Sequence, residues 1–254
     1  MFQKYFACTC VGALLSLGFA MQAAAGVSVG GTRVIYDATK REASVSIRNI
    51  GSSPYVVQTW IDSGTERSVG DKTPLVVTPP LSRLDAGKEN ILRIVRAGGK
   101  LPDDRESVLW LNVKEIPTKI GEENVLQIAL RTRIKIFYRP AAMPTFKGGS
   151  LAAPAALQWV LIPGVGGIGK ALKITNPTPY HITFSSLAVN GATKQEIDID
   201  MVPPSGERIF PLTSVLGEFN GPLKISFSTI NDYGAHSDPK EMMVSLANAP
   251  DGAE

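Results

Sequence analysis

This sequence contains few cysteines and histidines, and its net charge is small. The two cysteines, Cys8 and Cys10, lie within the first 25 residues, and the only histidines are His181 and His236. Without further cysteines, a transition-metal site would need both histidines close together, with carboxylates beside them. We therefore expect neither a metal nor another cofactor. The formal net charge is +3 over 254 residues, so the composition indicates no nucleic-acid partner.

The first 25 residues have the features of a secretory signal. Lys4 gives a basic start, residues 6–19 are apolar or small, and alanines at 23–25 supply the small residues of a cleavage site. The apolar run is shorter than the ~20 residues of a membrane span, which argues against an anchor, and no later stretch resembles a span. We therefore expect an exported mature chain from about Gly26, without disulfides and stabilised by its own core.

The motifs of common enzymes are missing as well. Residues 164–170 match the spacing of a phosphate-binding glycine-rich loop up to Lys170, but Ala171 replaces the hydroxyl residue that would hold magnesium. Such a loop also opens a helix, whereas residues 172–175 read as a strand, so a hairpin loop is favoured. The Gly-x-Ser-x-Gly motif of many hydrolases is absent. We expect no enzymatic activity.

Helical periodicity is nearly absent, and short alternating or β-branched runs take its place. Proline, glycine, asparagine and aspartate separate these runs at a spacing typical of an all-β sandwich. The expected strands are 43–48, 55–61, 91–95, 108–113, 125–138, 157–161, 171–175, 181–187, 208–212, 223–229 and 242–246.

The composition changes after Tyr138. Residues 139–144 contain two prolines and show no periodicity, which suits a hinge. We therefore divide the chain into a signal peptide (1–25) and two sandwich domains (26–143 and 144–254), the second ending in a short tail.

Residues 124–138 form the most informative segment. Leu126, Ile128 and Leu130 fall on one face of an extended strand, and polar or small residues fall on the other. A run of fifteen residues is far longer than the usual five or six. Alternation alone suits a core strand, but a strand that outruns its own sheet can also pair with another chain.

The end of this segment, residues 134–140, resembles the G1 strand of the periplasmic chaperones that assemble P pili and type 1 pili. Six further segments resemble the same family in the same order, so that the seven together cover most of both expected domains. These segments are 31–36, 78–84, 104–107, 111–117, 176–180 and 230–234.

The resemblance implies a fold, a function and partners. The family's fold is all-β, with two immunoglobulin-like β-sandwich domains joined at an angle by a short hinge. Its members are non-enzymatic chaperones of the periplasm that bind pilin (fimbrial) subunits. A pilin lacks the last strand of its immunoglobulin fold, and the chaperone's G1 strand fills the gap until an outer-membrane usher exchanges it for the next subunit. The resemblance implies no membrane insertion, and it allows two copies to cap each other as a dimer.

Four residues are implied to enter the pilin groove. They are Leu126, Ile128 and Leu130, with Asn124 near the end of the groove.

Arg33 and Lys135 match the two basic positions that bind the pilin's C-terminal carboxylate in the family. Without the resemblance, both would read as ordinary strand cations. In an ideal strand Lys135 has the opposite parity to the apolar donor residues. A twist or a bulge near Thr132, or contact with the pilin from two sides, would account for that difference.

The resemblance further implies an ion-pair network between the domains and a surface for the usher. The network residues are Glu106, Arg139 and Asp232, and the usher surface consists of Thr78, Pro79, Pro80, Ile116 and Pro117. The alternative interpretations are separate surface charges and prolines that merely end strands.

Two features of the sequence, a loop length and a missing disulfide, can be compared with those of relatives. The connection 118–123 is short, which matches the branch with a short F1–G1 loop. Relatives often carry a disulfide in the second domain, whereas this chain has no cysteine there.

Two other functions compete with a pilin chaperone. One is a structural or adhesive sandwich protein, and the other is a periplasmic enzyme. Pilins usually have one domain, a disulfide and an N-terminal alternating extension, whereas this chain has two expected domains and an internal alternating strand.

Overall fold

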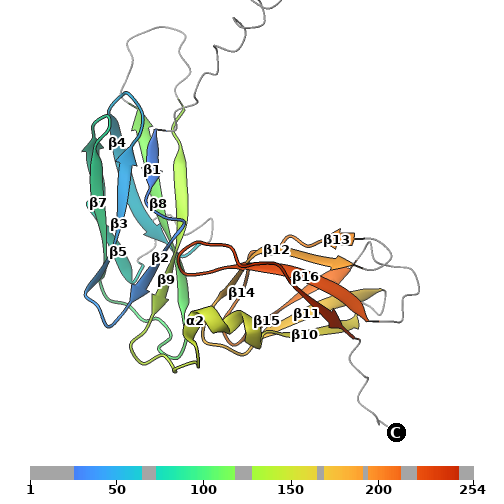
Figure 1. Ribbon diagram of the computed structural model, residues 1–254. Coiled ribbons are helices and arrows are strands. Elements are labelled where there is room, and N and C mark those ends of the chain that lie inside the picture. Colours follow the sequence, from blue (N-terminus) through green and yellow to red (C-terminus); the bar gives the residue numbers. More distant parts are fainter. Residues whose placement is uncertain are drawn as a thin grey trace, which may run out of the picture.

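A computed structural model shows two β-sandwich domains set at an angle to each other (Figure 1). It describes residues 26–64, 73–117, 128–164, 169–190, 194–212 and 222–245. The expected signal peptide, the tail after residue 245, the 118–123 connection, Asn124 and Leu126 lie outside these residues.

The N-terminal domain contains two sheets. One has the order β1 (Val27–Val29), β3 (Glu42–Asn49), β7 (Glu89–Arg96) and β5 (Leu75–Thr78). The other has the order β2 (Arg33–Asp37), β9 (Arg131–Arg139), β8 (Ser107–Pro117), β4 (Tyr55–Asp62) and β6 (Leu81–Leu84). Strand β2 pairs with β9 in parallel, and the other pairs in this domain are antiparallel.

The C-terminal domain also consists of two sheets. Its first sheet has the order β10 (Gln158–Pro163), β11 (Lys170–Asn176) and β15 (Gly206–Leu212). Its second has the order β13 (Lys194–Glu196), β12 (Ile182–Asn190), β16 (Leu223–Ile230) and β17 (Lys240–Val244), and β14 (Met201–Val202) also pairs with β12. A short helix α2 (Gly149–Ala152) and a 3₁₀ turn η3 (Ala153–Ala156) follow the hinge.

Each sandwich has its own hydrophobic core, because residues of one parity on each strand point between the two sheets. Ile47, Leu92 and Ile136 are fully buried in the first core, which draws on residues from Val27 to Tyr138. The second core draws on residues from Ala153 to Val244. The all-β fold with two domains agrees with the prediction. Within the described part of the chain, no helix has the length and hydrophobicity needed to cross a membrane.

The expected strand over 125–138 is wrong over residues 128–130, and residues 125–127 lie outside the described part of the chain. Strand β9 starts at Arg131, so Ile128 and Leu130 precede it, although the Glu115 N–H still donates to the Leu130 carbonyl at 3.0 Å. The expected hairpin at 164–170 is confirmed, because Pro163 and Lys170 are partners in the antiparallel pair β10–β11. Strands β1, β2, β5, β6, β13 and β14 were not among the expected strands, because two to five residues are too few to show a period.

Candidate functional site

Strand β9 presents its two faces to different domains. Ile134, Ile136 and Tyr138 are buried in the N-terminal core. The alternate residues point the other way, and each contacts the C-terminal domain. These contacts are an ion pair from Lys135 to Asp200, ring packing of Phe137 on His181 with centroids 5.9 Å apart, and ion pairs from Arg139. The period of two therefore makes β9 both a core strand and one wall of the domain junction.

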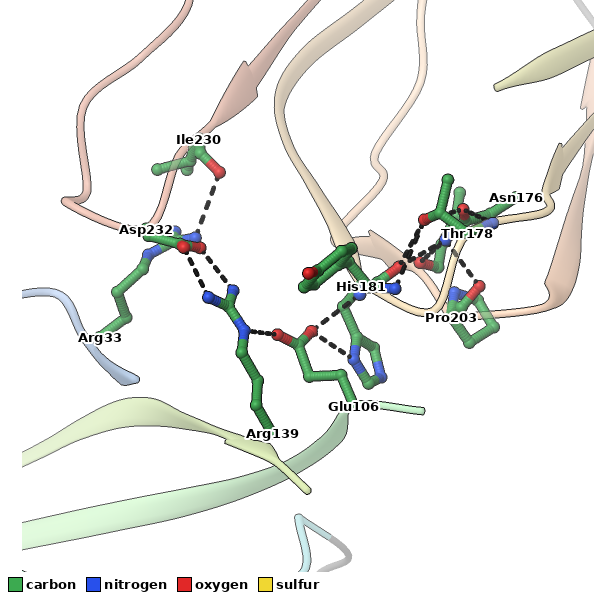
Figure 2. Close-up of polar contacts among 11 residues, drawn as sticks. Arg33, Glu106, Arg139, Asn176, Thr178, His181, Pro203, Ile230 and Asp232 are labelled. Carbon is green, nitrogen blue, oxygen red and sulfur yellow. Dashed lines mark hydrogen bonds and ion pairs between the residues drawn. The ribbon is translucent and has the colours of Figure 1, made fainter. Parts of the chain in front are cut away.

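Arg139 stands between two carboxylates at this junction (Figure 2). Its Nε donates to Glu106 Oε1 at 2.9 Å, and its two terminal nitrogens donate to the two oxygens of Asp232 at 2.7 Å each. The bond to Asp232 crosses from one domain to the other and is bidentate, the strongest geometry for such a pair. The three residues implied by the family resemblance are thus brought together.

Glu106 is 2 % exposed, and its carboxylate has a second partner that the sequence did not reveal. The backbone N–H of His181 donates to Glu106 Oε2 at 2.8 Å, and the Nδ1 atom of His181 lies 3.0 Å from the same oxygen. A buried carboxylate must be saturated with hydrogen bonds to be tolerated. His181 therefore belongs to the network, and the segment 176–180 just before it was the only sequence signal nearby.

The charges of this network reinforce each other. Burial alone would lower the pKa of Arg139, but its bonds to Asp232 and the nearby charge of Glu106 outweigh burial and raise the pKa above its usual value. Burial likewise pushes the pKa of Asp232 upward, yet hydrogen bonds from Arg139 and Ser150 hold that pKa below its usual range. Both groups are therefore charged at neutral pH.

Two asparagine-centred turns hold the C-terminal half of the network. Asn176 Oδ1 accepts from the Thr178 N–H at 3.0 Å, and its Nδ2 donates to the Tyr180 and Pro203 carbonyls at 2.7 and 3.0 Å (Figure 2). This turn presents His181. Asparagine side chains stabilise such turns by bonding to the backbone nearby.

The second turn presents Asp232. Asn231 Oδ1 accepts from the N–H groups of Tyr233 and Ala235, both at 3.0 Å. Gly234 has φ +81° and lies against Thr32, whose Oγ1 would be 2.4 Å from a Cβ added to that glycine. Only glycine permits both this backbone conformation and the close approach of the two domains.

The two basic residues of the proposed carboxylate site are direct neighbours. Arg33 on β2 and Lys135 on β9 are Cα partners in the parallel pairing, so both side chains leave the same face of the sheet. Lys135 pairs with Asp200 and lies over the Trp110 ring, with Nζ 5.4 Å from the ring centroid.

Arg33 is left with unused hydrogen-bonding capacity. One terminal nitrogen donates to the Ile230 carbonyl at 3.3 Å, while its Nε is buried without a partner among the described residues (Figure 2). Burial lowers the pKa of Arg33, although the charges of Asp232, Glu106 and Asp200 oppose that shift. A buried donor without an acceptor is costly, so an arriving anion would be stabilised here.

The residues preceding β9 are exposed and apolar. Ile128 is 63 % exposed and Leu130 is 49 % exposed. Strand β2 pairs only with Lys135–Arg139 of β9, so within the described residues the β9 segment 131–134 has β8 as its only hydrogen-bonded neighbour. One edge of this segment is therefore open to another strand.

A bulge near Thr132, one of the alternatives that would account for the parity difference, is absent from the described pairing. The β8–β9 register runs without a shift from Ser107↔Tyr138 to Lys114↔Arg131. Leu130 keeps the parity of Ile134. Among the described residues, Leu130, which precedes β9, therefore has the opposite parity to Lys135.

A buried aspartate holds the start of β9. Asp62 on β4 is 2 % exposed and accepts hydrogen bonds from Arg133 at 2.8 Å, Arg131 at 3.3 Å and Asn112 at 2.8 Å. The two guanidinium groups also lie over the rings of Trp60 and Trp110, at 5.0 and 4.2 Å from the centroids. These contacts span three strands and were not visible in the sequence.

The five residues of the expected usher surface form two separate groups. Thr78 and Pro79 are joined by a cis peptide bond, and the carbonyls of Pro79 and Pro80 accept hydrogen bonds from Thr59 on β4 at 2.7 and 2.9 Å. Ile116 and Pro117 end β8, on the other side of β4. The structure brings each group to β4 but does not join them.

Comparison with known families identifies the fold and the class of protein. Residues 26–144 match the family described as "Pili and flagellar-assembly chaperone, PapD N-terminal domain". Residues 152–241 match "Pili assembly chaperone PapD, C-terminal domain". The chain belongs to the pili assembly chaperone family. Members of this family are not enzymes, and the function of the chain is that of a chaperone in fimbria assembly.

Individual pili assembly chaperones are similar over most of their length. The probable fimbrial chaperone YadV of Escherichia coli (strain K12) is 38% identical over 228 residues, which cover 86% of this chain and 90% of YadV. The probable fimbrial chaperone LpfB of Escherichia coli O157:H7 is 42% identical over 219 residues, which cover 85% of this chain and 87% of LpfB.

Solved structures of the family agree with the fold. The crystal structure of YadV has a TM-score of 0.72 and 36% identity, covering 87% of this chain and all of that one. A chain from the structure of the Salmonella enterica SafA pilin in complex with the SafB chaperone has a TM-score of 0.68 and 30% identity, covering 86% of this chain and 96% of that one.

Proposed function

We propose that this chain captures pilin subunits by lending them the segment that leads into β9. The open edge of β9 is the observation that carries the proposal, since strand addition requires unpaired backbone groups next to apolar side chains. Ile128 and Leu130 are exposed at this edge although both are large and apolar. Asn124 and Leu126 would continue the same alternation into the subunit's groove. In the SafA–SafB structure, a chaperone and a pilin are bound together.

In this proposal, Arg33 and Lys135 bind the C-terminal carboxylate of the subunit. Their adjacent positions on β2 and β9 allow one carboxylate to meet a guanidinium and an ammonium together. The buried Nε of Arg33, which has no partner among the described residues, supports an anionic ligand at this point. Since only the chain end carries that carboxylate, this contact would set the register of the added strand.

The network of Glu106, Arg139 and Asp232 would then fix the angle between the domains and hence the approach to both basic residues. We further propose that residues 1–25 direct the chain to the periplasm and that it delivers its subunits to an outer-membrane usher. Thr78–Pro80 and residues 116–117 would contact that usher. Two free copies would cap each other through the same apolar segment.

Affinity capture from periplasmic extract tests this function. The tagged chain is expected to recover small pilin-like proteins in one-to-one complexes, because each subunit lacks one strand and the chaperone supplies one. An adhesive or structural sandwich protein would instead recover no such proteins, and that outcome would contradict the proposal.

A further inference from the structure

The ammonium of Lys135 already has a carboxylate partner in the free protein. That partner is Asp200, which belongs to the other domain and forms an ion pair with Lys135 across the junction. The side chain of Lys135 is only 13% exposed, whereas that of Asp200 is 61% exposed. A ligand that arrives from solvent therefore meets the carboxylate of Asp200 at the ammonium.

The backbone holds Asp200 in this position. The Asp200 carbonyl accepts a hydrogen bond from the Phe184 N–H at 3.0 Å, and the next two residues form β14, which pairs with Ile182 and Thr183 of β12. An aspartate side chain has few rotatable bonds, so its carboxylate loses little conformational freedom in this pair. The ion pair therefore joins Lys135 on β9 to an ordered residue directly before β14.

We propose that Asp200 is an internal competitor for the subunit's C-terminal carboxylate, and that it sets how strongly the site selects a true chain end. This inference rests on the proposed role of Arg33 and Lys135. An incoming carboxylate must either displace Asp200 from Lys135 or share the ammonium with it at the cost of repulsion between like charges. Binding of the chain end is weakened in both cases.

The competition favours ligands that bring more than a carboxylate. A small free carboxylate has only its charge with which to displace Asp200. A pilin end also contributes strand pairing and apolar contacts, and these raise its affinity independently of Asp200. Asp200 lowers the affinity of both ligands by a similar factor, but only the subunit has enough additional binding energy to remain bound.

Asp198 provides a matched control. It carries the same charge two residues earlier, is exposed, and forms no ion pair with the residues that the structure describes. Asp198→Asn and Asp200→Asn change the net charge equally and keep the side-chain shape, so they differ in the ion pair with Lys135 and in the charge that acts on Arg33.

The test uses a synthetic peptide of the C-terminal strand of a pilin recovered with this chain, made as a free acid and as an amide. Titration calorimetry would compare the wild type, both asparagine variants, Lys135→Met and the double variant Lys135→Met/Asp200→Asn. We expect Asp200→Asn to bind the free acid about 1.5- to fivefold more tightly, the range typical of one partly exposed ion pair. It should leave amide binding unchanged. Asp198→Asn should change neither, and Lys135→Met should abolish the gain.

Three results would overturn the inference. These are no gain for the free acid, an equal gain for both peptides, or a gain that persists without Lys135. If Asp200 only fixed the domain angle, its loss would weaken both peptides alike. A wild type that binds acid and amide equally would instead refute the proposed carboxylate site, so the two failures are distinguishable.

Discussion

Arg33 and Lys135 lie 102 positions apart in the sequence and are direct Cα partners in the parallel pair β2–β9. Parallel pairing places their side chains on the same face, and β9 turns that face toward the C-terminal domain. Two cations side by side repel each other unless an anion lies between them. An anion beside both cations would relieve that repulsion, which is why the proposed function assigns them the subunit's C-terminal carboxylate.

The first prediction removes one cation of this pair. Arg33→Ala or Lys135→Ala should lower pilin affinity by about 30-fold to several thousand-fold, because truncating one partner of a desolvated charge pair costs ~2–5 kcal/mol. Calorimetric titration with a purified pilin would measure the change. The free protein should melt within a few degrees of the wild type. An unchanged affinity would refute the role of these residues.

The second prediction concerns the apolar segment before β9. Ile128→Asp should abolish subunit capture, since an apolar side chain worth ~1.5–3 kcal/mol is replaced by a charge that a groove would have to desolvate. The matched control is Ile91→Asp on β7, because Ile91 is 54 % exposed on the other sheet of the same domain. Both variants should remain folded by circular dichroism. Unfolding of Ile128→Asp alone would show that this residue is part of the core.

The long strands and the pattern of β9 could be predicted because they depend on local alternation. Residues 134 to 138 show the inward and outward positions directly in the sequence. The expected beginning of that strand was wrong, because apolar alternation at Ile128 and Leu130 continues beyond the hydrogen-bonded part of the sheet. Periodicity reports which side chains share a face but does not report where a sheet ends.

The third prediction concerns the domain angle. Arg139→Ala should leave the buried carboxylate of Glu106 without its cation and should separate Asp232 from the N-terminal domain. Removing one partner of a buried pair costs roughly 3–5 kcal/mol, and the partial exposure of Asp232 favours the lower end.

Small-angle scattering should show a wider range of domain orientations for this variant, and the periplasmic yield should fall. Arg83→Ala removes an arginine from an exposed pair with Asp85 and should change neither measurement. Identical scattering for Arg139→Ala and the wild type would count against the network as the determinant of the angle.

The fourth prediction follows from the pKa of Asp232, which is lower in the folded protein than its usual value. A carboxylate with a depressed pKa contributes stability in full above its unfolded pKa of about 3.9, and that contribution is lost as the pH falls further through the folded pKa. The domain orientation measured by scattering should therefore be constant between pH 7 and 5 and should loosen below about pH 4.

Asp232→Asn should be loosened at every pH and should show less change on acidification. Loosening of the wild type between pH 7 and 5, or an identical acid transition in Asp232→Asn, would contradict the assignment. Asp85→Asn serves as the control, because its side chain is exposed on the surface.

Contacts between distant residues could not be predicted from patterns within the chain. His181 and Glu106 are 75 positions apart, and nothing local in either segment indicates that they meet. The family resemblance grouped Glu106, Arg139 and Asp232, but it did not include His181. Asp200 was missed for another reason, since the two-residue strand β14 that follows it is too short to leave a readable period.

The last prediction concerns Asp62, which binds Arg131 and Arg133 at the start of β9. Burial raises the pKa of Asp62, but bonds from Arg133, Asn112 and the Gly64 N–H outweigh that effect and lower it, so the group is charged at neutral pH. Asp62→Asn keeps the shape but removes the charge that both guanidinium groups share. We expect a loss of about 1.5–3 kcal/mol, the range for a hydrogen bond to a charged group.

Hydrogen exchange should locate that loss. Amide protons of residues 131–134 should exchange faster in Asp62→Asn, because their attachment to β4 and β8 weakens, while exchange in β12 and β16 stays as in the wild type. Pilin affinity should fall about tenfold. The segment that pairs with the subunit would then extend from a less ordered part of β9, and ordering it on binding costs free energy. The preference for a free C-terminal acid over an amide should persist, because Arg33 and Lys135 are untouched. Asp85→Asn should reproduce the wild type in every measurement. If exchange in 131–134 is unchanged while affinity falls, Asp62 acts on the subunit in some way other than by holding β9.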